Sequence, residues 1–165
     1  MKPLRAISLW QPWASLMAVG AKHIETRHWP TEYRGLVAIH AAKKWNNELE
    51  DLCFDEPFAK WLFPDEILPK PNNLPRGCIV AVAHLSGCVS TNERNLIPEP
   101  RTAERAFGNY DPNRFMWLFP RIWKLSSPVF VRGQQGFWTL SETETDVIEA
   151  LMPDDWELEL KGENQ

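Results

Sequence analysis

Three charged side chains, Lys22, Glu25 and Arg27, stand close together early in the sequence. The stretch from His23 to Arg27 alternates like a half-buried strand, which places Glu25 and Arg27 on one face. A lysine just before this strand could contact a phosphate or transfer a proton, with the glutamate as its partner. The alternative is a surface ion pair, which contributes little to stability.

A second polar group occupies the sequence Gly133-Gln134-Gln135-Gly136, a predicted tight turn that leads to Phe137 and Trp138. Each glutamine amide both donates and accepts hydrogen bonds, as recognition of a base edge requires. The alternative is an ordinary hairpin turn with solvated amides.

The net charge of −4 hides an uneven distribution along the 165 residues. Residues 1–44 hold seven Lys/Arg against two Asp/Glu, and residues 76–138 hold eight against four. Residues 45–75 are acidic, with two Lys/Arg against seven Asp/Glu, and residues 139–165 hold one against nine. If the basic segments share a sheet and the acidic ones lie outside it, one positive face forms on an acidic protein. Solvated surface is the alternative.

The elements that must position these residues follow from the hydrophobic pattern. Strands are expected at residues 6–9, 23–27, 35–41, 77–89, 115–125 and 129–132. A short helix is expected after the first strand, a helical insert at about 46–75, and a helix near 102–107. Ser141 and Glu144 form a predicted capping box for a further helix before an acidic tail. Five to six strands with peripheral short helices predict an α+β protein built on a small barrel.

Composition excludes several classes of function. The three cysteines lack a CxxC motif, which argues against a zinc site or a disulfide framework and indicates a reducing compartment. The longest uncharged run, residues 6–21, is too short to span a bilayer, and the amino end does not resemble a signal peptide. We therefore expect a cytoplasmic, monomeric protein with no metal, cofactor or membrane partner. The nine tryptophans belong mostly to the core.

Five stretches in order resemble the ASCH (activating-signal-cointegrator homology) family, a branch of the PUA-like barrels. The stretches are ISLWQPWASLMAVGAKHIETRHW, YRGLVAIHAAKK, the strand from Gly77-Cys78, FGNYDPNRFMW and PVFVRGQQGFW. The first holds a G-x-K-x-x-E-x-R signature on Gly20, Lys22, Glu25 and Arg27. The resemblance covers roughly residues 4–140, so residues 1–140 form the expected domain and residues 141–165 an added helix and tail.

The resemblance implies a cleft at the barrel mouth that accepts RNA, DNA or a modified nucleoside. The residues predicted to bind nucleic acid are Lys22, Arg27, Arg34, His40, Lys43, Lys44, Arg114, Arg132, Gln134 and Gln135. The aromatic residues expected to stack on bases are Trp29, Tyr33 and Trp138. His40 has an alternative role, as a strand-end histidine bonded to the backbone.

Some members of the family are hydrolases, including amidohydrolases of acylated cytidine and a ribonuclease. The amidohydrolase pattern requires a lysine with a nucleophilic threonine three residues later, but Glu25 occupies that position and Thr26 faces the opposite side. A metal-independent hydrolase with Lys22 and Glu25 as its catalytic residues, assisted by His40, is the alternative to a binding domain. A third hypothesis is a protein partner for the acidic insert and tail.

Overall fold

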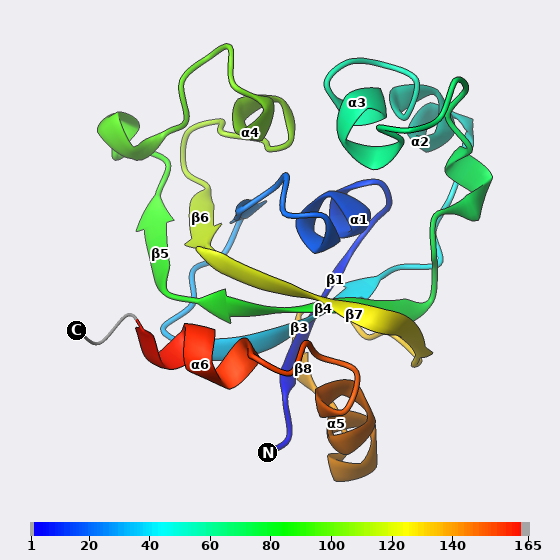
Figure 1. Ribbon diagram of the computed structural model, residues 1–165. Helices are drawn as coiled ribbons and strands as arrows, with labels where there is room; N and C mark the ends of the chain where they lie inside the picture. Colours follow the sequence, from blue (N-terminus) through cyan, green and yellow to red (C-terminus); the bar gives the residue numbers. More distant parts are fainter. Residues whose placement is uncertain (1, 163–165) are drawn as a thin grey trace.

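The computed structural model describes residues 2–162 and contains eight strands in two sheets (Figure 1). The larger sheet has the order β7-β4-β3-β1-β8, and the smaller sheet has the order β2-β6-β5. The strands are β1 (Arg5–Leu9), β2 (Ile24–Arg27), β3 (Gly35–Ala41), β4 (Cys78–Leu85), β5 (Gly87–Ser90), β6 (Phe115–Leu118), β7 (Arg121–Phe130) and β8 (Phe137–Thr139). The α+β class is confirmed. The strand count of five to six is wrong, and no pairing within residues 2–162 joins the two sheets into a closed barrel.

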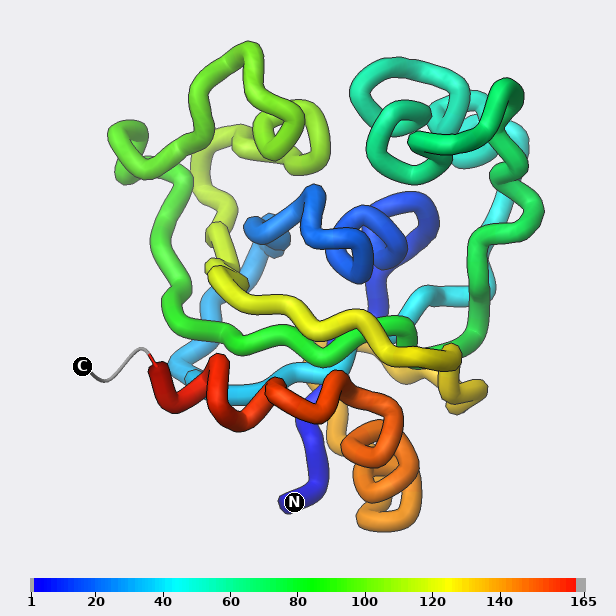
Figure 2. The backbone as a smooth tube through the Cα atoms, viewed as in Figure 1, coloured from blue at the N-terminus to red at the C-terminus, as the bar shows by residue number. Residues whose placement is uncertain are grey.

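The helices cover both faces of the larger sheet. They are α1 (Trp13–Ala18), α2 (Asn47–Leu52), α3 (Phe58–Leu62), α4 (Ala103–Ala106), α5 (Glu142–Glu149) and α6 (Trp156–Lys161), with short 3-10 turns η1 (Pro71–Asn73) and η2 (Arg94–Leu96). Figure 2 shows α1 to α4 on one side of this sheet and α5 and α6 on the other. None of the helices in the described part is long and apolar enough to cross a membrane.

Each face of the larger sheet carries its own core, because alternate side chains of a strand point to opposite faces. Ile7 and Leu9 of β1 pack with α1 and with Trp117 of β6, while Ala6 faces the second core. The second core is closed by Trp123 of β7 and by Ile148 of α5. The predicted capping box is confirmed at Ser141 and Glu144, and it starts α5.

Two predicted strands are each divided between the sheets. The apolar run 77–89 turns at Ser86, so that β4 lies in the larger sheet and β5 in the smaller one. The run 115–125 divides in the same way at Phe119 and Pro120. The turn expected at 126–128 does not form, because β7 continues through it to Phe130.

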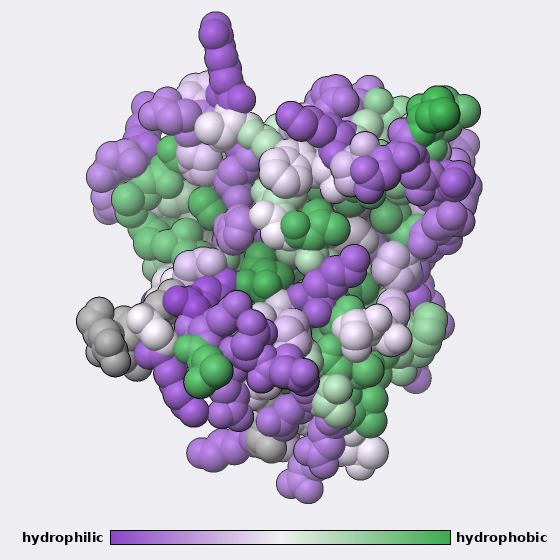
Figure 3. Space-filling view, viewed as in Figure 1, coloured by the Kyte–Doolittle hydropathy of each residue, from purple (hydrophilic) through white to green (hydrophobic). Residues whose placement is uncertain are grey.

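Apart from Thr139 at the end of β8, the acidic segments lie outside the sheets, which is the condition that the sequence analysis set for one positive face. In the insert, α2 and α3 turn Leu49 and Phe58 inward, and the Phe58 ring packs on Trp13 and Phe107. The tail forms α6, whose Trp156 ring contacts Trp123, and Figure 3 shows a mainly hydrophilic surface over this helix. Residues 163–165 of the predicted tail lie outside the described residues.

Candidate nucleic-acid interface

The parallel pairing of β1 with β3 brings two distant parts of the chain to one edge of the larger sheet. Ser8 and His40 are direct partners in this pairing, close to the carboxyl ends of both strands. Segments that leave parallel strands at their carboxyl ends meet at one edge, which is where open α/β sheets bind ligands. Trp10 leaves β1 at this edge, and Lys43 and Lys44 follow β3.

Two adjoining cavities open at this edge. The first, here named the Gln134 cavity, has a volume of about 810 Å³ and is bordered by Ser8, Trp10, Arg27, His40, Lys43, Phe130 and the turn 131–136. The second, the Glu25 cavity, has a volume of about 630 Å³ and is bordered by Ser8, Trp10, Lys22, Glu25, Thr26, Arg27, His28, Asn109 and Arg114. Because Ser8, Trp10 and Arg27 line both, the two form one groove, which we name the basic groove.

The basic groove gathers positive charge from separate segments of the chain. The cations that line it are Lys22, Arg27, Lys43, Arg114 and Arg132. Glu25 is the one carboxylate among its lining residues. Side chains from both basic segments therefore converge on one concave surface.

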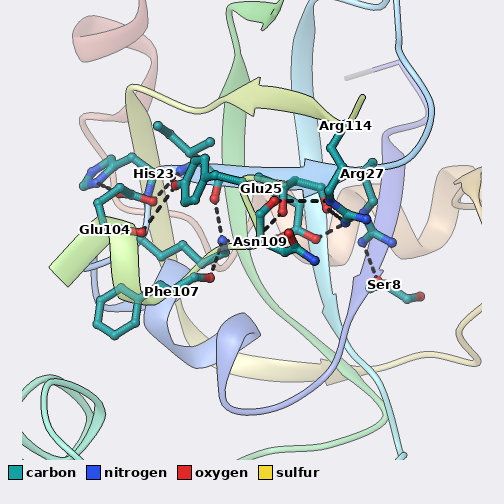
Figure 4. A network of polar contacts seen from close by, with 12 residues as sticks. Ser8, His23, Glu25, Arg27, Glu104, Phe107, Asn109 and Arg114 are labelled. Atoms are coloured by element: carbon teal, nitrogen blue, oxygen red, sulfur yellow. Dashed lines mark hydrogen bonds and ion pairs between the residues drawn. The ribbon is translucent and has the colours of Figure 1, made fainter. Parts of the chain in front are cut away.

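Lys22, Glu25 and Arg27 form a connected triad along the groove. The Lys22 Nζ lies 3.3 Å from Glu25 Oε2, and the Arg27 Nε lies 3.1 Å from Glu25 Oε1. The Arg27 guanidinium also donates to the Ser8 carbonyl oxygen at 2.8 Å (Figure 4). The triad carries one net positive charge, and the arginine is held between two acceptors at the junction of the cavities.

Lys22 does not project into the groove as the sequence analysis expected. Its side chain is only 1% exposed, and its ammonium donates to the carbonyl oxygens of Ile24 and Phe107 in addition to the ion pair with Glu25. Since an ammonium has three hydrogens, these acceptors use all of them. The turn that follows α1 buries this lysine, and its ammonium fixes the position of the Glu25 carboxylate. The simple surface ion pair is also wrong, because the pair is nearly enclosed.

The loop that carries α4 closes the Glu25 cavity. The Glu104 carboxylate accepts hydrogen bonds from the backbone N–H groups of His23 and Ile24, at 2.7 and 3.0 Å (Figure 4). Arg114 donates to the carbonyl oxygens of Thr26 and Asn109. Its guanidinium is thereby fixed at the cavity wall beside β2.

His40 is 2% exposed and lies against the turn 131–136. Its Nε2 is 3.1 Å from the Val131 carbonyl oxygen, so the expected backbone contact is present, and its Nδ1 is 3.1 Å from Ser8 Oγ. Burial lowers the pKa of His40, and the nearby Lys43 lowers it further, although the contact with Val131 acts in the opposite direction. The free protein therefore favours a neutral imidazole.

Not all predicted contacts reach the groove. Arg34 lines neither cavity, because its guanidinium donates to the carbonyl oxygens of Thr31 and Tyr33. Lys44 lies at the edge, with its Nζ 3.7 Å from the centre of the Trp10 ring. Gln134 and Gln135 are exposed on the turn, where the sequence analysis expected them, and Arg132, expected at the end of a strand, is exposed there too. The alternative of a hairpin turn is wrong, because this segment joins β7 and β8, which lie at opposite edges of the larger sheet.

The aromatic residues predicted to stack on bases also lie outside the two cavities. The rings of Trp29, Tyr33 and Trp138 pack edge-on against Trp117, Phe137 and His40, respectively. Four aromatic residues that the sequence analysis did not select line the groove instead, and two of them are exposed, namely Trp10, 46% exposed, and Phe130, 78% exposed; Trp13 and Phe107 are more enclosed. Each of the two exposed residues lies at the end of a strand, and for Trp10 its position directly after the first strand is the signal that could have identified it.

The described residues contain no group of three or more His, Cys, Asp or Glu side chains placed to hold a metal ion. Burial, with Glu50 nearby, raises the pKa of Cys53 to about 11, and burial also raises the pKa of Cys78, so neither of these two thiols is an activated nucleophile. The Thr26 side chain is 7% exposed, and its hydroxyl accepts from the Asn109 N–H.

Comparison with known proteins agrees with this architecture. The ASCH domain model matches residues 7–119, and the chain belongs to the ASCH domain family, which is generally associated with RNA binding. The mouse (Mus musculus) and human (Homo sapiens) proteins named activating signal cointegrator 1 are each 28% identical over 139 residues, which is 79% of this chain and 24% of theirs. The chain thus spans about a quarter of the length of these relatives.

Solved structures of an ASCH protein from Zymomonas mobilis share the fold. The unmodified protein superposes with a TM-score of 0.53 and 15% identity, covering 90% of this chain and 95% of that one. A point mutant of it gives a TM-score of 0.56 and 16% identity, with 90% and 98% covered. At these identities the match describes the fold alone.

Proposed function

We propose that the basic groove binds single-stranded RNA. The observation that carries this proposal is the convergence of Arg27, Lys43, Arg114 and Arg132 on one concave surface whose single carboxylate is already paired with Lys22 and Arg27. Phosphates occupy such a surface because each contact releases condensed counterions. A groove, unlike a flat basic face, admits a flexible strand with its bases turned inward.

The aromatic and amide side chains indicate that a base of the RNA would lie in the Gln134 cavity. The exposed ring of Trp10 offers a stacking surface beside the phosphate contacts, with Phe130 also on the border of the Gln134 cavity. Gln134 and Gln135 provide amides that pair with base edges. The triad holds Arg27 between the two cavities, so a phosphate there would have a nucleoside on either side.

The test is fluorescence anisotropy with a labelled ten-nucleotide RNA, competed by DNA of the same sequence and by free nucleosides. We expect saturable binding that weakens as the salt concentration rises, with RNA competing best. Equal competition by DNA would remove the preference for RNA, and competition by a nucleoside alone would reassign the groove to a small ligand. The absence of binding at low salt would refute the proposal.

A metal-independent hydrolase is the second candidate, favoured by the 3.3 Å contact between the Lys22 ammonium and the Glu25 carboxylate inside a cavity. The test is turnover of an acylated cytidine, or cleavage of RNA, in the presence of a chelator. Glu25→Gln should abolish turnover, while Glu32→Gln, at an exposed glutamate that lines neither cavity, should retain it. Turnover that survives Glu25→Gln would exclude this role.

A protein partner for the acidic tail stays a separate proposal. Deletion of residues 141–165 would not test it, because Ile148 and Met152 complete the second core. Reversal of the charges of Glu157 and Asp146, both exposed, removes acidity without opening the core. Loss of a pulled-down partner, with unchanged RNA binding, is the expected result, and a partner retained at full yield would refute it.

A further inference from the structure

Three polar contacts connect Val131 and Gln134 of the turn 131–136 through His40 and Ser8. The Val131 carbonyl oxygen lies 3.1 Å from His40 Nε2, and His40 Nδ1 lies 3.1 Å from Ser8 Oγ. The Ser8 hydroxyl lies 3.0 Å from the Gln134 carbonyl oxygen. All three distances are those of ordinary hydrogen bonds.

The number of hydrogens in this chain depends on the charge of His40. Both terminal groups are carbonyl oxygens, which only accept, so three contacts need three hydrogens. A neutral imidazole has one N–H and the serine has one O–H, which leaves one contact without a hydrogen. The imidazolium has two N–H groups, and with it His40 donates to Val131 and to Ser8, while Ser8 donates to Gln134.

The Ser8 hydroxyl therefore reports the protonation state of His40 to the turn. When the imidazole is neutral and donates to Val131, the single Ser8 hydrogen has two acceptors in reach, His40 Nδ1 and the Gln134 carbonyl oxygen, whereas the imidazolium leaves it to Gln134 alone. The turn and the ring are also in close contact, since a methyl group at Gly133 would lie 2.3 Å from His40 Cε1. A movement of the imidazole ring would therefore displace the turn at Gly133.

The charges around His40 explain why a bound phosphate would change the protonation state of the imidazole. Lys43, Arg27 and Arg132 border the same cavity and oppose a further positive charge, and Glu144 borders a smaller cavity with Gln134 and Trp138. In the free protein, burial and Lys43 keep the pKa of His40 below its ordinary value. A phosphate bound among these cations would reverse their effect, because an opposite charge favours the charged imidazolium.

We infer that binding of an RNA phosphate in the Gln134 cavity is coupled to uptake of a proton by His40, which then anchors the Gln134 turn through Ser8. His40 is a positioning residue in this scheme, and the inference rests on the proposed function. Its measurable consequence is an affinity that increases as the pH falls. If binding raises the pKa of His40 by about one unit, the affinity rises by up to about tenfold across the transition.

The test is isothermal titration calorimetry with a ten-nucleotide RNA at pH 6.5, in buffers that differ in ionisation enthalpy. The wild type should take up a fraction of one proton per RNA bound, and its His40 ring resonances should titrate at higher pH in the complex. His40→Gln should bind without this uptake, and His23→Gln, at a partly exposed histidine that lines neither cavity, should retain it.

The two proposals fail in different ways. Binding with no proton uptake, or with equal uptake in His40→Gln, overturns the inference and leaves RNA binding intact. No binding in any buffer overturns the proposed function itself. Ring resonances that show the same His40 titration in the free and bound protein would overturn the inference even if His40→Gln failed to fold.

Discussion

Replacement of Arg132 by alanine gives a quantitative test of the basic groove. Arg132 is exposed, borders the Gln134 cavity and lies on the turn beside Gln134. Arg34 is also exposed but lines neither cavity, so Arg34→Ala removes the same side chain and charge elsewhere on the protein. Exposed substitutions of this kind change the free energy of unfolding by no more than about 0.5 kcal/mol.

The expected magnitude follows from the number of available cations. Lys22 is enclosed, which leaves Arg27, Lys43, Arg114 and Arg132 as possible phosphate contacts. For a single strand each contact adds about −0.7 to the slope of log affinity against log salt, so four contacts give about −2.8. Loss of one contact changes the slope to about −2.1 and weakens binding at low salt by roughly fivefold, or about 1 kcal/mol.

The assay is anisotropy of a labelled RNA at salt concentrations that span a tenfold range. The wild type and Arg34→Ala should give the same slope, and Arg132→Ala should give a shallower one. Equal slopes for the two arginine variants, whether both match the wild type or both fall below it, would refute the assignment of phosphate binding to the groove.

Three further predictions concern the enclosed lysine, the buried histidine and the exposed tryptophan. Lys22→Met should lower the free energy of unfolding in urea by about 3 kcal/mol, because it leaves the nearly enclosed Glu25 carboxylate with Arg27 alone and two carbonyl oxygens short of a donor, whereas exposed Lys60→Met should change little. The pKa of His40 is lowered in the folded state, so the unfolded chain binds more protons and the protein should lose stability as the pH falls below the ordinary value of 6.5. Urea titrations should show a decline of at most about 1.4 kcal/mol per pH unit that His40→Gln removes; an unchanged decline would contradict this. Trp10→Ala should weaken RNA binding by about 1–3 kcal/mol in the anisotropy assay, and Trp61→Ala, at a similarly exposed ring outside the groove, should not.

Local patterns predicted most elements because each depends on neighbours in sequence. The alternation in β2, the apolar run of β3 and the capping box at Ser141 all appear where expected. The breaks at Ser86 and Pro120 were missed, because hydrophobic residues continue across both positions. At both positions the chain passes from one sheet to the other. Which sheet a strand joins depends on strands that are distant in the sequence.

The site was predicted in composition more than in geometry. Charge counting located the two basic segments, residues 1–44 and 76–138, that supply Arg27, Lys43 and Arg132. It could not show that Lys22 is enclosed, because one of the acceptors that surround it is the carbonyl oxygen of Phe107, 85 positions away in the sequence. Trp10 was missed for a different reason, because its position directly after the first strand was a signal in the sequence that the analysis did not use.

Stability alone does not account for the Lys22–Glu25 pair. Removing two charges from water costs about as much as their attraction returns, and apolar residues in the same space often stabilise a protein equally well. The pair has a geometric effect that apolar residues would not reproduce, because it holds one carboxylate oxygen of Glu25 against the Arg27 guanidinium while Ser8 holds the other side. Arg27 can therefore meet a phosphate without first losing the freedom of a long side chain, which reduces the entropy cost of binding. On this argument Lys22 acts through Glu25 and Arg27, and under the proposed function the arginine is the group that meets the RNA phosphate.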